Sequence, residues 1–80
     1  MKLQPHQLTY IAEDLGKRRP APIGWLLLLA QHRSEVVREG AIYGLAMHRD
    51  RMDVGKRLER MAIEDASDCI RIAAIEALEP

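Results

Sequence analysis

A twelve-residue segment occurs twice in this chain, 33 positions apart. Residues 34–45 read SEVVREGAIYGL and residues 67–78 read SDCIRIAAIEAL, with five aligned positions identical. Similarity at a fixed period of this size is typical of stacked repeats, in which each helical unit buries its apolar face against the next unit. We therefore expect one all-α domain over residues 1–80, folded as a short right-handed α-solenoid of about five helices.

The N-terminal part of the chain predicts one helix followed by a linker. Apolar residues at helical spacing fall on one stripe of a segment spanning about residues 4–15, namely Leu8, Ile11, Ala12 and Leu15. Gly16 follows as a C-terminal cap. Pro20 and Pro22 then interrupt the pattern, because proline removes a backbone donor and disfavours helix in the preceding residue.

Two helical hairpins are expected after this linker. They span residues 22–48 and 52–80, and residues 1–16 form an N-terminal covering helix. The first hairpin begins with a helix over about residues 23–31. Short connections favour antiparallel pairs, so the second helix should pack on the third and the fourth on the fifth.

Polar residues mark the expected helix starts. Ser34 and Ser67 precede the third and fifth helices, where a serine hydroxyl can accept a hydrogen bond from a first-turn N–H group. Asp50 or Asp53 is expected to cap the fourth helix in the same way. The third helix should end near residue 47, and the fifth near the end of the chain.

Small residues recur four apart in both copies of the repeat, at Gly40 and Gly44 and at Ala73 and Ala77. A glycine inside a helix costs about 1 kcal/mol relative to alanine. Such a cost is tolerated where two helix backbones must approach closely. We therefore expect a closely packed neighbour along this ridge.

The repeated segment resembles the second helix of a HEAT-like repeat, in the short variety found in phycobilin-lyase-type proteins. That family places an aspartate in a turn before the pattern Val-Arg-x-x-Ala-x-x-Ala-Leu. The resemblance covers roughly residues 23–78, and His32 stands where the family usually has aspartate. The matching residues are Asp65, Ile70, Arg71, Ala74, Ala77 and Leu78 in the later copy and Val37, Arg38, Ala41 and Leu45 in the earlier one.

The resemblance implies a ladder of ion pairs between neighbouring units. On this analogy Arg38 reaches Asp65 across the groove between units, and both Arg38 and Arg71 have a structural role. With His32 in place of aspartate, the other rung of the ladder is expected to be missing.

Composition excludes several classes of protein. Lys and Arg number 12 and Asp and Glu number 12, which argues against a dedicated nucleic-acid binder or a polybasic membrane protein. The longest apolar stretch, residues 25–30, is too short to span a bilayer, and the N-terminus lacks the apolar region of a signal peptide. One cysteine cannot form an internal disulfide, so we expect a cytoplasmic protein.

No catalytic, cofactor or metal motif is present. The three histidines have no ligand spacing, and we expect no metal and no cofactor. Some HEAT-like hydroxylases hold two irons through His-Glu pairs, but the corresponding positions here read Arg38-Glu39 and Arg71-Ile72. An enzyme, lyase-like or metal-dependent, is therefore only a distant third interpretation.

The favoured interpretation is a non-catalytic protein-interaction module, a small adaptor or inhibitor. At 100° per residue, one set of side chains turns away from the core on the face that is concave in HEAT-like stacks, where aromatic and branched residues could anchor a partner protein. Burial of this face by curvature is the alternative. A homo-oligomer through the last helix is a further expectation. The predicted binding residues are Val36, Glu39, Tyr43, Cys69, Ile72 and Glu76.

The alternative function is a nucleic-acid-binding accessory protein that uses basic loops between helices. Six cations lie in predicted joints and could gather on one edge of the stack. Loss of affinity with added salt would be the signature of such binding. These residues are Lys17, Arg18, Arg19, Arg33, Arg49 and Arg51.

Overall fold

The computed structural model describes residues 4–18 and 20–80 of the chain. Over those residues it contains five α-helices and no β-strand, which confirms the predicted all-α fold class. The helices are α1 (Pro5–Lys17), α2 (Ile23–Leu29), α3 (Glu35–Ala46), α4 (Met52–Glu64) and α5 (Asp68–Leu78).

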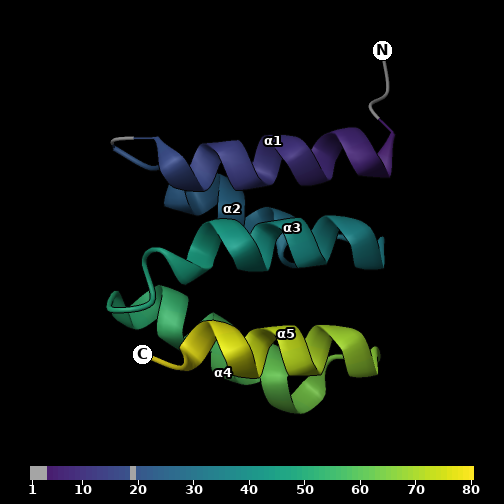
Figure 1. Ribbon diagram of the computed structural model, residues 1–80, viewed down its shortest axis with the longest axis vertical. Helices are drawn as coiled ribbons and strands as arrows, with labels where there is room; N and C mark the ends of the chain where they lie inside the picture. The colour runs from purple at the N-terminus through teal and green to yellow at the C-terminus, as the bar shows by residue number, and fades with distance from the viewer. Residues whose placement is uncertain (1–3, 19) are drawn as a thin grey trace.

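The helices form two layers (Figure 1). In one layer α1, α3 and α5 lie side by side and run in the same direction, and α2 and α4 lie behind them. α3 packs against α1, α2 and α5, whereas α4 packs mainly against α5. The two repeated segments are thus parallel neighbours, and α1 covers the far side of α3. That these layers constitute a HEAT-like solenoid stays a prediction.

The core is aliphatic, because the chain contains no phenylalanine. α3 is the central helix, and six of its twelve residues are buried. α1 contributes less than its apolar stripe predicted, since Ala12 is fully buried but Ile11 is 39% exposed. The largest fully buried side chains are Leu26, Val37, Ile42, Leu45, Val54, Leu58 and Ile70.

α1 and α2 both approach α3 closely at Gly44. A Cβ atom added there would lie 2.6 Å from the backbone oxygen of Ala12 and 2.8 Å from Cδ2 of Leu26. Both distances are far below normal van der Waals contact, so only glycine fits without a shift of the neighbouring helix. The predicted close approach along the small ridge is therefore real at this position.

Several predicted helix ends are wrong. The N-cap of α4 is Arg51 rather than Asp50 or Asp53, and Asp53 instead lies in the first turn, where a carboxylate interacts favourably with the helix dipole. α1 continues to Lys17, past the predicted cap at Gly16, and α2 ends at Leu29. The predicted cap at Ser67, by contrast, is confirmed. Its hydroxyl accepts a 3.3 Å hydrogen bond from the N–H of Ile70.

Ser34 occupies the N-cap position of α3, but its hydroxyl makes no capping hydrogen bond. Its backbone N–H donates to Nδ1 of His32 at 2.9 Å, and the N–H of Ser67 donates to Oδ1 of Asp65 at 3.0 Å. The imidazole of His32 therefore accepts the same turn hydrogen bond as the carboxylate of Asp65 one repeat later. The two repeats share a turn in spite of the change from aspartate to histidine.

This shared turn leads to a first prediction. His32→Ala should lower the free energy of unfolding by about 1 kcal/mol, because the N–H of Ser34 loses its acceptor. His32→Asp should keep most of that stability, since a carboxylate accepts the equivalent bond at Asp65. Urea denaturation measures both effects. Equal losses in the two variants would show that the hydrogen bond contributes nothing.

Candidate functional site

The Arg38–Asp65 pair joins α3 to the turn that precedes α5. Nε of Arg38 lies 2.9 Å from Oδ2 of Asp65, and Nη2 lies 3.1 Å from Oδ1. Nη1 also donates to the backbone oxygens of His32 and Arg33 at 3.0 Å. The side chains are only 16% and 8% exposed. The predicted Arg38–Asp65 contact is thus present, and it has a structural role because every acceptor belongs to a turn of the fold.

Arg71 repeats part of this pattern one unit later. Its guanidinium donates to the backbone oxygen of Asp65 and pairs with the carboxylate of Asp68. Among the described residues, no arginine side chain bonds to the imidazole of His32. Its Nδ1 accepts a hydrogen bond from the backbone N–H of Ser34 instead. The structure therefore contains one ladder rung between α3 and α5, with Arg71 holding its own turn.

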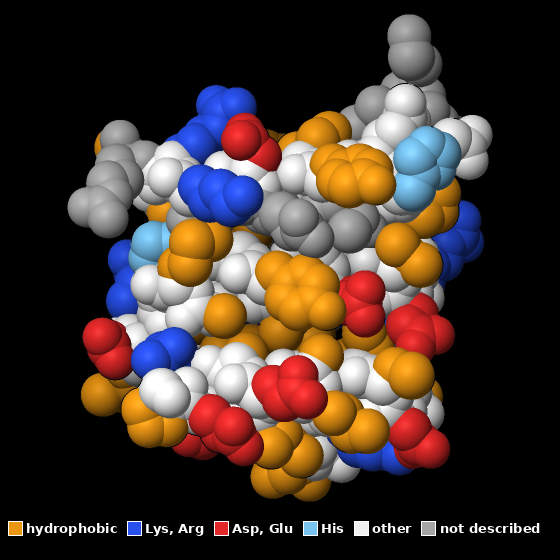
Figure 2. All heavy atoms as spheres, in the orientation of Figure 1, with side chains coloured by type: hydrophobic (Ala, Val, Ile, Leu, Met, Phe, Trp, Pro, Cys, Tyr) orange, Lys and Arg blue, Asp and Glu red, His pale blue; other side chains and the backbone are white. Residues whose placement is uncertain are grey.

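The α3–α5 face comprises the six predicted protein-binding residues. Three of its apolar side chains are about half exposed: Val36 at 47%, Tyr43 at 48% and Ile72 at 56%. Cys69 and Glu76 are also exposed, whereas Glu39 is half-buried. Because α3 packs against α1, α2 and α5, its exposed residues must lie on its remaining side. Figure 2 shows this side, with apolar groups over the middle of α3 and along α5 and acidic groups among them.

Apolar exposure also extends beyond the predicted residues. Tyr10 on α1 is 70% exposed, and Ile75 on α5 is 48% exposed. Figure 2 shows apolar side chains over α1 on the same side of the molecule as those over α3. Tyr10 lies off the apolar stripe of its helix. Its position could therefore have identified it from the sequence as an exposed aromatic residue of the candidate site.

Of the five predicted basic residues that the structure describes, four lie at one end of the layer and only Arg33 lies at the other. α1 and α3 run in the same direction (Figure 1), so the cations after their C-terminal ends lie at one end of the layer, and Arg33, before α3, lies at the other. Arg18 pairs with Asp14 at 3.0 Å, and Arg51 pairs with Asp53 at 3.1 Å. Arg19 lies outside the described residues. The basic residues at the shared end are therefore partly neutralised by aspartates.

The Arg51–Asp53 pair shifts the pKa of both of its groups. The hydrogen bond from Arg51 lowers the pKa of Asp53, and the same bond, followed by the charge of Asp53, raises the pKa of Arg51. A lowered carboxyl pKa contributes stability above the unfolded-state pKa, and this is lost as the pH falls through the folded-state value. The effect is small because both side chains are about half exposed, so solvent screens their interaction.

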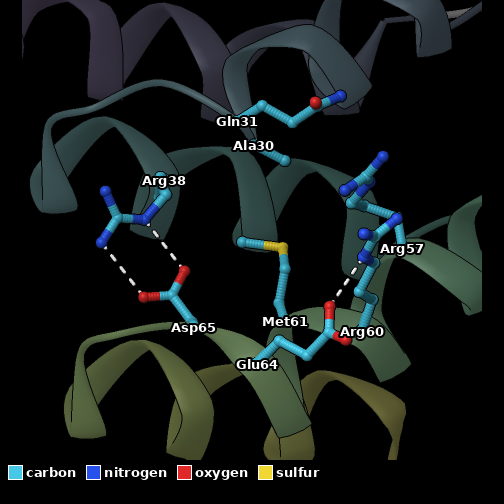
Figure 3. A pocket seen from close by; sticks show the side chains of 8 residues that line it. All are labelled: Ala30, Gln31, Arg38, Arg57, Arg60, Met61, Glu64 and Asp65. Carbon is cyan, nitrogen blue, oxygen red and sulfur yellow. Dashed lines mark hydrogen bonds and ion pairs between the residues drawn. The ribbon is translucent and has the colours of Figure 1, made fainter.

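A groove lies between α2 and α4, on the layer opposite the α3–α5 face. One cavity of about 190 Å³ is lined by Ala30, Gln31, Arg38, Arg57, Arg60, Met61, Glu64 and Asp65. An adjoining cavity of about 370 Å³ shares three of these residues and adds Leu27, Asp53 and Lys56. We call the two together the α2–α4 groove. Figure 3 shows Met61 between the Arg38–Asp65 pair on one side and Arg57 and Arg60 on the other.

Groups suited to catalysis are sparse in the described part of the chain. Cys69 is a free, exposed thiol. No set of three His, Cys, Asp or Glu side chains lies close enough to hold a metal ion among the residues that the structure describes.

Within the described ranges, none of the helices is both long and apolar enough to cross a membrane.

Comparison with known proteins finds no matching family model, no matching curated protein and no matching solved structure. The resemblance to HEAT-like repeats thus continues to depend on the repeated segment itself.

Proposed function

We propose that the protein is a non-catalytic interaction module that binds another protein through the α3–α5 face. The observation that carries this proposal is the half exposure of Val36, Tyr43 and Ile72 on two adjacent parallel helices. Large apolar side chains gathered on a rigid surface are typical of protein interfaces, and aromatic residues commonly dominate their binding energy.

The charges around this face indicate what the partner surface is like. Glu35 and Glu76 are exposed on α3 and α5, and Asp68, which is also exposed, is paired with Arg71. Arg38 and Arg71, the cations of these two helices, are both engaged in the turns. A partner with an apolar anchor and a rim of lysine or arginine would therefore be complementary, and charge complementarity mainly accelerates association.

A nucleic-acid accessory role receives less support. Two of the four cations that gather at one end of the layer are paired with aspartates, and Arg33 lies at the other end. A second copy of the chain is the other candidate occupant of the apolar face. Light scattering at high protein concentration distinguishes it, because self-association would raise the measured mass.

Tyr43→Ser should reduce partner binding at least about tenfold, because it removes the aromatic anchor of the face. The measurement is capture of host proteins on the immobilised chain, with the amount of each recovered protein compared between variants. Ile63→Ser is the matched control, since Ile63 is 78% exposed on α4 and lies outside the face. Circular dichroism checks that both variants remain folded.

The outcomes separate clearly. A partner retained by the wild type and by Ile63→Ser but lost by Tyr43→Ser supports the proposal. Equal recovery by all three proteins, or equal loss in both variants, would overturn it.

A further inference from the structure

The α2–α4 groove contains an arginine that the fold does not use. Arg57 is half-buried in the wall shared by both cavities. Its side chain makes no hydrogen bond or ion pair with the described residues. Its neighbour Arg60 pairs instead with Glu64 at 2.7 Å, and Arg38 pairs with Asp65, as the dashed lines in Figure 3 show. A half-buried guanidinium without an acid partner is favourable only if water or a ligand solvates it.

The charges of the groove do not cancel. Each of its three carboxylates is already paired with an arginine: Asp53 with Arg51, Glu64 with Arg60, and Asp65 with Arg38. Two cations are left over, Arg57 and Lys56, and both line the larger cavity. They belong to the same turn of α4. The unpaired charge of the groove is therefore positive and concentrated in one place.

The walls of the smaller cavity suit a carboxylate on an aliphatic stem. Met61 and Ala30 line the cavity, and the small part of each that is exposed there gives methylene groups an apolar contact. The planar guanidinium of Arg57 can bind both oxygens of a carboxylate. A nucleic-acid backbone fits less well, because its phosphates and sugars offer no methylene stem to this apolar wall.

We propose that the α2–α4 groove binds an acidic peptide segment of a partner protein, with one carboxylate on Arg57 and a neighbouring one near Lys56. Charge complementarity and the apolar wall beside Arg57 carry this assignment. The site lies on the layer opposite the α3–α5 face, so it goes beyond the proposed function and can hold when that function fails. The chain would then contact proteins on both of its broad sides.

The test uses fluorescence anisotropy with the full chain and a short labelled peptide of glutamate and serine. The wild type should bind this peptide, and a counterpart peptide with glutamine in place of every glutamate should not bind. Arg57→Gln should weaken binding about tenfold. Lys56→Gln should weaken it less, because Lys56 is more exposed. Amide chemical shifts should change along residues 27–31 and 56–64.

Arg33→Gln is the matched control. It removes one positive charge from an exposed loop residue that lines neither cavity, so binding should remain within about twofold of the wild type. A charge exchange adds a second test: Arg57→Glu should lose the acidic peptide and gain binding to a peptide of lysine and serine.

Three results would overturn the proposal. The acidic peptide does not bind, or Arg33→Gln weakens it as much as Arg57→Gln, or a single-stranded oligothymidylate binds in the groove more tightly than the peptide. Tyr43→Ser should leave binding of the acidic peptide unchanged, which separates failure of this site from failure of the α3–α5 face.

Discussion

Asp65→Ala should lower the free energy of unfolding by about 3 kcal/mol, the largest effect expected of any single substitution considered. Removing one member of a largely buried ion pair leaves the other charge without compensation. Here Arg38 would keep its bonds to the backbone of the preceding turn but lose both contacts with the carboxylate. The N–H of Ser67 would also lose its acceptor.

Urea denaturation followed by circular dichroism measures this loss. Domains of this size are stable by roughly 4–12 kcal/mol in total, so a loss of about 3 kcal/mol would move the midpoint far to lower urea concentration. Glu64→Ala is the control. It breaks an ion pair whose side chains are 67% and 61% exposed, and exposed pairs contribute only about 0–1 kcal/mol.

A double variant tests the mechanism. Arg38→Met combined with Asp65→Leu removes both charges, and it should be less destabilised than Asp65→Ala alone, because no charge is left buried. If Asp65→Ala and Glu64→Ala cost the same, the Arg38–Asp65 pair does not hold α3 and the α5 turn together.

The repeated segment made the main packing of this fold predictable from the sequence. A period of 33 residues placed two similar helices side by side, and Figure 1 shows α3 and α5 as parallel neighbours. The family resemblance pointed from Arg38 to Asp65, although the two residues are far apart along the chain. Helix ends were less predictable, because capping depends on local competition: the backbone N–H of Ser34 bonds to His32, while its hydroxyl makes no cap.

The candidate sites were predictable to different degrees. Exposure of Tyr43 and Ile72 follows from helical periodicity within one segment, so the α3–α5 face could be found from the sequence. The α2–α4 groove could not, because Gln31 lies in the turn after α2, Arg57 lies on α4, and no local pattern links them. Lys56, Arg57 and Arg60 look like an ordinary solvated helix face until the ion pairs show which of them are already engaged.

Gly44→Ala should lower the free energy of unfolding by about 2 kcal/mol, although alanine is the better helix former. The added methyl group would lie 2.6 Å from the backbone oxygen of Ala12, which belongs to α1 and cannot rotate away as a side chain could. α1 would have to move away from α3, and the contacts of the fully buried Ala12 would weaken.

Gly24→Ala is the matched control, because the same change should here raise the free energy of unfolding by about 0.5–1 kcal/mol. Gly24 is an exposed residue of α2, and a Cβ atom there would meet nothing within 4 Å. Urea denaturation of the two variants should therefore move the midpoint in opposite directions. A rise in stability for both would mean that α1 tolerates a wider spacing from α3, and the small-residue ridge would then have no packing role at Gly44.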